Sequence, residues 1–318
     1  INNYEIIDEL GRGTHGKVKL GRNLATNEYV AIKIVERYSK KRRLGKLGNA
    51  EDKVKKEVAI LKKARHPNIV ALLEVIDDPA RKKVYIVLER VELGEIVWQI
   101  LDADFHPDLQ FVPCMSMNAA RVAFRDTVLG LQYLHYQGII HRDIKPPNLL
   151  QTADHRTKIS DFGVSYLGRP INDDQLAKTV GTAAFYAPEL CYTDGTSETP
   201  PVGPAIDVWA LGITLFCMLF GRTPFVDNEF VVMRRIADEE IYVPRRRLRP
   251  VDPRPKSRPS SHGRYFPPAA SGKRSEYELA YEDLDDLLLD LFRRLLQKDP
   301  AKRITLEEVR HHPWVVQD

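Results

Sequence analysis

Residues 141–150 read His-Arg-Asp-Ile-Lys-Pro-Pro-Asn-Leu-Leu and are the most informative stretch of the sequence. It follows Asn118–Tyr136, where apolar residues recur at helical spacing and predict an amphipathic helix that leads into a polar loop. Thirteen residues beyond Asn148 comes Asp161-Phe162-Gly163, and Ala187-Pro188-Glu189 follows further on. Each string alone is consistent with a solvated ion pair or a turn. Their order and spacing together argue against a chance occurrence.

The first ninety residues have the pattern of a small antiparallel sheet with one helix. Short runs of apolar and β-branched residues alternate with Gly and Asn, which is typical of strands joined by turns. A helix is predicted for Ala50–Ala64, where Val54, Val58 and Leu61 recur at helical spacing. The five predicted strands are Tyr4–Leu10, Lys17–Leu20, Tyr29–Val35, Ile69–Ile76 and Val84–Leu88.

A Gly-x-Gly-x-x-Gly string at residues 11–16 joins the first two predicted strands. In a dinucleotide-binding unit this string opens a helix, whereas here Lys17–Leu20 has the alternation of a strand, so the glycines belong to a hairpin. Such a hairpin can lay backbone N–H groups over phosphates because glycine has no Cβ. An ordinary glycine-rich turn is the alternative for the string on its own.

Val30-Ala31-Ile32-Lys33 places one lysine in an otherwise apolar strand. A buried ammonium is costly unless it is paired, and Glu57 on the predicted helix is its natural partner. A lysine held by a glutamate can neutralise phosphate oxygens without drifting. The alternative is a surface lysine on an edge strand and a solvated glutamate among neighbouring lysines.

Composition excludes several classes of protein. The 318 residues are 43% hydrophobic, and 48 Lys and Arg against 44 Asp and Glu give a net charge of only +4, which argues against a dedicated nucleic-acid binder and a disordered chain. The longest apolar stretch, Val208–Phe220, is shorter than the ~20 residues that cross a bilayer. It predicts a buried helix over Asp207–Gly221 that Asp207 caps. Three cysteines without metal-ligand spacing favour a reducing compartment, so we expect a cytoplasmic protein without disulfides.

Together, these strings resemble the signature set of eukaryotic protein kinases over nearly the whole chain. The resemblance implies an α+β, bilobal protein kinase fold. Residues 1–90 would form a small antiparallel β lobe with one main helix, and residues 91–318 a larger, mainly helical lobe. It also implies ATP and Mg²⁺ as cofactors.

The resemblance assigns a nucleotide-binding role to the charged residues. Lys33, supported by Glu57, would hold the α- and β-phosphates. Asp161 and Asn148 would bind Mg²⁺, a hard cation that prefers oxygen ligands.

The same resemblance assigns catalytic and structural roles. Asp143 would orient the substrate hydroxyl and accept its proton, and Lys145 would contact the γ-phosphate as in serine/threonine kinases. Thr182 would be the matching hydroxyl in the substrate-facing loop. Arg303 would pair with Glu189, and helices over 283–297 and 305–310 would close the domain.

The same resemblance to protein kinases implies that apolar residues surround the adenine and that Leu88 is the gatekeeper. Leu61, Leu72, His141 and Phe162 would stack into the spine of the active enzyme, and ordinary core packing is the alternative for them. The remaining nucleotide-site residues implied by the resemblance are Leu10, Gly11, Gly13, Gly16, Val18, Ala31, Glu89, Val91, Glu95 and Leu150.

Within the family, the chain most resembles the calcium/calmodulin-dependent protein kinase kinases and the upstream kinases of the AMP-activated kinase. The resemblance rests on residues 57–63, 74–79, 128–135, 141–150 and 207–210, among which Glu-Val-Ile-Asp-Asp-Pro is moderately specific. It implies that the protein substrates are other kinases, phosphorylated on activation-loop threonines, with calmodulin binding only through segments outside this chain. A pseudokinase scaffold and a kinase with a different substrate class stay open as alternatives.

Pro147 stands where arginine-directed kinases carry a glutamate. The missing carboxylate argues against a simple basic consensus and favours recognition of a folded substrate. Two basic stretches, Arg37–Lys46 and Arg245–Arg274, interrupt the pattern. The second has ten Lys or Arg against one Asp and is rich in Pro and Ser, so we expect a flexible, disordered insert. A docking or nucleic-acid role is the alternative, although the charge balance of the chain disfavours nucleic acid as a partner.

The loop before Thr182 bears on activation. Many kinases need a loop phosphate to neutralise the arginine that corresponds to Arg142, but the usual position is Lys178 here. Asp173 and Asp174 could balance Arg142 instead. We therefore expect a domain that is active without loop phosphorylation, with Thr179 as the alternative switch.

Overall fold

The computed structural model describes residues 1–13, 16–37, 50–101, 111–168, 180–192, 202–250 and 281–317. The chain forms two compact units. The first combines residues 1–95 with 126–181, and the second combines residues 96–125 with 182–318. The lobe boundary expected at residue 90 stays a prediction, since the first unit also contains the segment of the catalytic loop.

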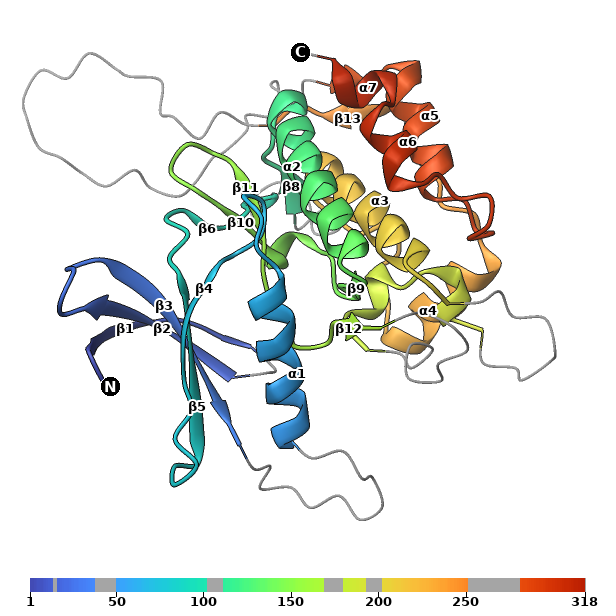
Figure 1. The fold of residues 1–318 in the computed structure, drawn as a ribbon. Coiled ribbons are helices and arrows are strands. Elements are labelled where there is room, and N and C mark those ends of the chain that lie inside the picture. The colour runs from blue at the N-terminus through green and yellow to red at the C-terminus, as the bar shows by residue number, and fades with distance from the viewer. Residues whose placement is uncertain are drawn as a thin grey trace, which may run out of the picture. The chain divides into compact units, whose positions relative to one another are not determined.

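The first unit contains the predicted antiparallel sheet of five strands (Figure 1). The strand order is β1-β2-β3-β5-β4. The predicted strands are confirmed, but β4 begins at Leu72 rather than Ile69, because Ile69 forms an isolated bridge with Ile159 instead. The five strands are β1 (Tyr4–Gly13), β2 (Gly16–Asn23), β3 (Tyr29–Glu36), β4 (Leu72–Ile76) and β5 (Lys83–Glu89).

The two faces of this sheet differ in their contents. One face carries a buried hydrophobic cluster of Tyr4, Val30, Ile32 and Val87. Side chains alternate along a strand, so Lys33 points to the other face. Residues opposite one another in an antiparallel pair share a face, and Val18, the partner of Lys33, therefore lies on this second face as well.

Of the basic stretch 37–46 the structure describes only Arg37, which is buried. Its guanidinium pairs with Asp77 and donates to the carbonyl oxygens of Asp78 and Arg81, at 3.2 and 3.3 Å. Both aspartates belong to the Glu-Val-Ile-Asp-Asp-Pro string. This string therefore anchors the end of β3.

Two small sheets hold the catalytic loop in the first unit. β10 lies between β11 and β6, and β12 pairs with β9. The loop itself runs between β9 and β10 and contains the 3-10 turn η1 (Pro146–Asn148), so strands fix both of its ends. The strands are β6 (Gly94–Glu95), β9 (Ile139–Ile140), β10 (Leu149–Gln151), β11 (Thr157–Ile159) and β12 (Tyr166–Leu167). Helix α1 (Ala50–Lys63) lies in this unit, and α2 (Met117–Tyr136) contributes residues to both units.

The second unit is built around α3 (Ala205–Phe220), in which every residue from Ile206 to Phe220 is buried. The prediction of a buried helix is confirmed, but the predicted cap is wrong. Pro204 occupies the N-cap, and Asp207 lies in the first turn. The helix ends at Gly221, whose φ of 68° favours glycine and where a Cβ would lie 2.6 Å from the carbonyl carbon of Val112.

Shorter elements complete the second unit. The predicted helix over 283–297 is confirmed but shorter, because strand β14 (Tyr281–Asp283) occupies its expected start. Within the described ranges, no helix has the length and apolar character that would let it cross a membrane. The elements are β7 (Gln99–Leu101), β8 (Phe111–Pro113), η2 (Ala183–Phe185), η3 (Pro188–Leu190), α4 (Glu229–Asp238), α5 (Asp286–Leu295), α6 (Leu306–Arg310) and α7 (Pro313–Val316).

The start of the basic insert predicted for 245–274 is ordered, so this part of the prediction is wrong. Strand β13 (Arg246–Leu248) pairs with β14. Arg247 is buried, and it donates to the carbonyl oxygens of Met115 and Leu219 at 3.0 and 3.1 Å and pairs with Glu282. Composition predicts a solvated segment because it does not reveal that these carbonyl oxygens and Glu282 pair with a buried guanidinium. Residues 251–274 lie outside the described residues.

Replacing Arg247 with alanine is expected to lower the free energy of unfolding by about 3 kcal/mol, because it leaves two buried carbonyl oxygens without their donor. Arg246→Ala is the matched control on the same strand, since Arg246 is exposed and pairs with exposed Asp283. Urea unfolding of both variants measures the difference. Equal unfolding midpoints would show that Arg247 is not part of the packed structure.

Candidate active site

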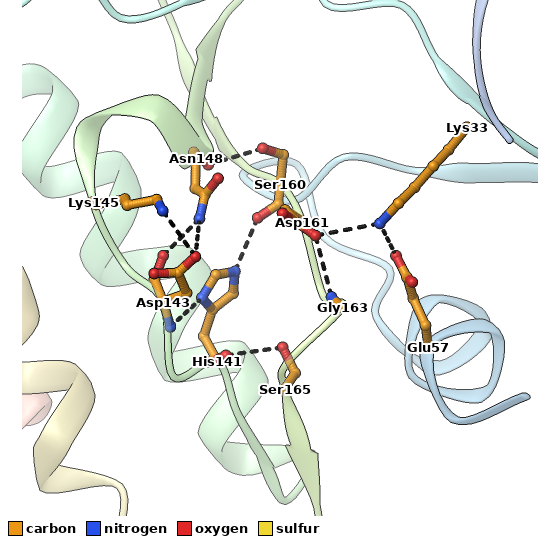
Figure 2. Close-up of polar contacts among 10 residues, drawn as sticks. All are labelled: Lys33, Glu57, His141, Asp143, Lys145, Asn148, Ser160, Asp161, Gly163 and Ser165. Carbon is orange, nitrogen blue, oxygen red and sulfur yellow. Dashed lines mark hydrogen bonds and ion pairs between the residues drawn. The ribbon is translucent and has the colours of Figure 1, made fainter. Parts of the chain in front are cut away.

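A buried lysine connects the sheet to α1 and to the Asp-Phe-Gly turn (Figure 2). The Nζ atom of Lys33 on β3 lies 2.5 Å from Oε1 of Glu57 on α1 and 3.3 Å from Oδ1 of Asp161. Lys33 and Glu57 are buried, whereas Asp161 is about one-third exposed. The predicted Lys33–Glu57 pair is therefore present, and the alternative of a surface lysine with a solvated glutamate is wrong.

The charge state of Lys33 follows from two opposing effects. Burial alone lowers the pKa of Lys33, but the carboxylates of Glu57 and Asp161 outweigh it, so the pKa of Lys33 is raised above its ordinary value. Lys33 thus stays a cation at neutral pH. A fixed positive charge beside a partly exposed carboxylate suits a site for anionic phosphate.

Asp143 is the centre of the second cluster, in the loop before η1. Asn148 donates from Nδ2 to the backbone oxygen of Asp143 at 2.7 Å and to its Oδ2 at 3.0 Å. Lys145 places Nζ 3.1 Å from the same Oδ2. The carboxylate of Asp143 is therefore held in one orientation by two neighbouring side chains (Figure 2).

Hydrogen bonds to backbone atoms hold this loop against the strands around it. Nδ1 of His141 accepts from the N–H of Asp143 at 3.2 Å, so its Nε2 is the protonated nitrogen and donates to the carbonyl oxygen of Ser160 at 2.9 Å. Ser165 donates from Oγ to the carbonyl oxygen of His141 at 3.0 Å. Ser160 donates from Oγ to the carbonyl oxygen of Asn148, also at 3.0 Å. Sequence patterns identified none of these serines.

Backbone strain marks both clusters. Arg142 and Asp161 have φ values of 72° and 58°, in the left-handed region that residues other than glycine rarely adopt. Gly181 also has a positive φ of 102°, and a Cβ there would lie 2.7 Å from the carbonyl oxygen of Arg142 and 3.1 Å from Oδ1 of Asp143. Only glycine lets the chain approach the Asp143 carboxylate this closely.

Comparison with known proteins identifies the arrangement. The family model described as the protein kinase domain matches residues 4–315. The chain belongs to this family.

The kinase domain is similar along its whole length to curated serine/threonine kinases. It is 48% identical to the serine/threonine-protein kinase ssp1 of Schizosaccharomyces pombe over 99% of this chain and 43% of that protein. It is 40% identical to SNF1-activating kinase 1 of Saccharomyces cerevisiae over 100% of this chain and 28% of that protein. The calcium/calmodulin-dependent protein kinase kinase of Caenorhabditis elegans is 35% identical over 100% of this chain and 53% of that protein.

These relatives confirm the expected family, the α+β kinase fold and the serine/threonine kinase class of this domain. The chain spans between about a quarter and about half of the length of these three relatives. The two subfamilies that the sequence resembled are represented among them.

The donor atoms of the kinase domain fit Mg²⁺ bound together with a nucleotide. Asn148 uses its amide hydrogens on Asp143, which leaves its Oδ1 to face a cation, and Asp161 supplies carboxylate oxygens. Among the described residues no group of three or more His, Cys, Asp and Glu could hold a metal ion by itself. Two oxygen ligands without a full protein cage match Mg²⁺, which completes its coordination with phosphates and water.

The residues predicted for the adenine and phosphates lie on neighbouring strands of the first unit. Ala31 is opposite Leu88, Val18 is opposite both Lys33 and Gly11, and all of these share the face of Lys33. Leu150 is opposite Glu95 in the smaller sheet. Leu10 is half exposed, and Val91 is buried. Their contact with a nucleotide stays a prediction, as it does for Gly13 and Gly16 at the β1–β2 turn.

Glu89 has an additional role that sequence reasoning missed. Its Oε1 accepts from the N–H of Ala71 at 2.7 Å and lies 2.8 Å from Nζ of Lys158 on β11. The side chain thus fixes the end of β5 to β11. Spacing does not reveal such a pair, because its two members are 69 residues apart.

Two of the four residues predicted for the spine are in contact, as either a spine or ordinary core packing would have them. The rings of His141 and Phe162 are 5.3 Å apart at an interplanar angle of 68°, an edge-to-face contact, and both are buried. Leu61 is buried on α1, and Leu72 begins β4. Whether the two leucines continue the stack stays a prediction.

Two of the predictions concern the second unit. Arg303 and Glu189 form the predicted pair, with Nη1–Oε1 and Nη2–Oε2 distances of 2.7 and 2.9 Å. Thr182 precedes η2, and its role toward a substrate stays a prediction. The activation-loop residues Asp173, Asp174, Lys178 and Thr179 lie outside the described residues, so activity without loop phosphorylation is untested.

Proposed function

We propose that this domain transfers the γ-phosphate of ATP to threonine or serine hydroxyls in the activation loops of other protein kinases. The observation that supports phosphoryl transfer most strongly is the continuous set of charges from Glu57 through Lys33 to Asp161, beside the oriented carboxylate of Asp143. A pseudokinase has no need to keep all of these groups. The relatives named as an SNF1-activating kinase and as a kinase kinase support the substrate class.

Each charged residue has a defined task in this reaction. The transition state is loose and spreads negative charge over the transferred phosphoryl oxygens, so positioning and neutralisation dominate catalysis. Lys33, locked by Glu57, holds the α- and β-phosphates, while Lys145 lies near the γ-phosphate. Asp161 and Asn148 would hold Mg²⁺, which when bound would neutralise phosphate oxygens.

Asp143 acts on the acceptor. Its carboxylate accepts a hydrogen bond from the substrate hydroxyl, directs the oxygen toward phosphorus and takes the proton as the new P–O bond forms. The hydrogen bonds from Asn148 and Lys145 keep the carboxylate in place while it does so. Thr182 would contribute a hydroxyl that helps to bind the substrate chain.

The test compares folded and unfolded acceptors. The purified domain is incubated with Mg-ATP and either an intact SNF1-type kinase, inactivated by substitution of its own catalytic lysine, or the isolated loop peptide. We expect phosphate on the loop threonine, mapped by mass spectrometry, with kcat/KM at least tenfold higher for the intact kinase. Efficient phosphorylation of unrelated proteins but not of intact kinases would contradict the substrate class. No transfer to any acceptor would support the scaffold alternative.

A further inference from the structure

The two residues assigned to Mg²⁺ lie at the same end of one antiparallel ribbon. Asn148 directly precedes β10, and Asp161 follows shortly after the end of β11. The two strands pair with Leu149 opposite Ile159, so Asn148 and Ser160 are the next pair in this register. Ser160 therefore lies opposite one of the proposed ligands and directly before the other.

One backbone hydrogen bond joins Asn148 to Ser160, where a regular hydrogen-bonded pair would exchange two. The N–H of Ser160 donates to the carbonyl oxygen of Asn148 at 2.9 Å. The N–H of Asn148, however, donates to the carbonyl oxygen of Lys145 at 3.0 Å. The carbonyl oxygen of Ser160 accepts from Nε2 of His141 at 2.9 Å. Both groups that would form the second bond of a regular pair are therefore used elsewhere.

The side chain of Ser160 supplies a second bond. Its Oγ donates to the carbonyl oxygen of Asn148 at 3.0 Å, so this oxygen accepts from both the N–H and the hydroxyl of one residue (Figure 2). Two bonds to one carbonyl oxygen restrict the backbone of Asn148. Nδ2 of the same asparagine donates to Asp143, so its backbone and its amide are both held. The Oδ1 atom, which would face the cation, then keeps one direction.

Asp161, the other proposed ligand, needs support of this kind. Its φ of 58° lies in the left-handed region, and such conformations persist only where the surroundings fix them. On one side, hydrogen bonds from the N–H, Oγ and carbonyl oxygen of Ser160 fix the preceding residue. On the other side, the N–H of Gly163 donates to Oδ1 of Asp161 at 3.2 Å. The hydroxyl of Ser160 is therefore connected to the positions of both proposed ligands.

We propose that Ser160 is a positioning residue for the Mg²⁺ site, whose hydroxyl fixes the spacing between the oxygen ligands of Asn148 and Asp161. Mg²⁺ demands near-ideal octahedral geometry, so a small displacement of either ligand weakens binding of the ion. This inference rests on the part of the proposed function that assigns Mg²⁺ to these two residues, and it does not depend on the substrate class. The alternative is a hydroxyl that contributes only to stability.

Ser165 provides the matched comparison. Its Oγ also donates at 3.0 Å to a carbonyl oxygen of the catalytic loop, but this oxygen belongs to His141, which is not a proposed ligand. Ser165 lies on the other side of the Asp-Phe-Gly turn and is buried. Loss of either hydroxyl thus removes one hydrogen bond of the same length from the same loop. Only the hydroxyl of Ser160 bonds to a proposed ligand.

The experiment titrates Mg²⁺ into the purified domain with a fluorescent ATP analogue and measures the Mg²⁺ concentration for half-maximal binding. We expect Ser160→Ala to raise this concentration about fivefold, which corresponds to about 1 kcal/mol, the contribution of one hydrogen bond. Ser160→Thr keeps the hydroxyl, and Ser165→Ala keeps the bond to Asn148, so both should stay within about twofold of wild type. Thermal unfolding without Mg²⁺ should have a lower midpoint in both alanine variants, because each loses a hydrogen bond.

Asp161→Asn is the reference for the metal assignment. If it leaves the Mg²⁺ requirement unchanged, or if wild type binds the analogue equally well without Mg²⁺, the assignment of Mg²⁺ fails and the role of Ser160 with it. If Asp161→Asn raises the requirement but Ser160→Ala does not, only the role of Ser160 is refuted. Equal increases in Ser160→Ala and Ser165→Ala would assign the effect to the whole turn and overturn the proposal. A Ser160→Thr variant as impaired as Ser160→Ala would overturn it as well.

Discussion

Replacing Asp143 with asparagine is expected to lower kcat by roughly 10²–10⁴-fold, the range for loss of a positioned general base. The amide keeps the shape of the side chain but cannot take the proton of the substrate hydroxyl. Nucleotide affinity should stay within about twofold, because Lys33 and Asp161 are untouched. Single-turnover phosphate transfer, together with titration of a fluorescent ATP analogue, separates the two effects.

Two further variants make this result specific. Asp161→Asn should act differently and raise the Mg²⁺ concentration needed for half-maximal nucleotide binding. Asp154→Asn is the control, since Asp154 is an exposed carboxylate of the same unit that accepts from Thr152. A variant Asp143→Asn that keeps more than a few per cent of kcat would exclude Asp143 as the proton acceptor.

Replacing Arg303 with alanine is expected to lower the free energy of unfolding by about 3–5 kcal/mol, the cost of leaving a buried charge unpaired. Both side chains of the Arg303–Glu189 pair are fully buried. All five N–H groups of Arg303 have acceptors: Nη1 and Nη2 donate to Glu189, and the others reach the carbonyl oxygens of Gln297, Ala205 and Lys298 at 2.8 to 3.1 Å. Its guanidinium also lies 5.3 Å from the ring of Trp209.

A double-mutant cycle tests this assignment. The cycle uses Arg303→Met, Glu189→Gln and the double variant, which should be less destabilised than Arg303→Met alone because it buries no unpaired charge. Arg293→Ala is the matched control, an exposed arginine paired with Asp290, and should cost no more than about 0.5 kcal/mol. Guanidinium unfolding curves measure all variants. Additive effects of the two substitutions would contradict a direct coupling.

The sheet could be predicted in detail because its signals are local. Each of the five strands has its own apolar alternation between turn residues, and the buried α3 has a continuous apolar run. The predictions from sequence are wrong where contacts between residues distant in the chain determine the local structure. Ile69 continues the apolar run of β4 but pairs with Ile159, and Arg247 belongs to a basic stretch yet is buried against carbonyls at 3.0 and 3.1 Å. Neither partner can be read from neighbouring residues.

The charged groups of the site were predicted because an ordered set of short strings identifies them. Pairing of Lys33 with Glu57 could be expected from the cost of a buried ammonium alone. These sequence motifs do not reveal the residues that hold the charged groups in place. Ser160 and Ser165 act through backbone atoms, and Glu89 and Lys158 are joined only by the fold, so their residue types and spacing carry no signal.

The β13–β14 ribbon has a consequence for how this family can vary. Leu248 and Tyr281 face one another across the ribbon, so strand pairing joins the two ends of the connection between β13 and β14. Adding flexible residues to a connection whose ends already meet costs only about 0.6 kcal/mol for each doubling of its length. Evolution can therefore lengthen, shorten or rewrite the residues between these strands while the helices and the catalytic loop keep their sequence constraints, and an experimenter can use the same point to insert a peptide tag.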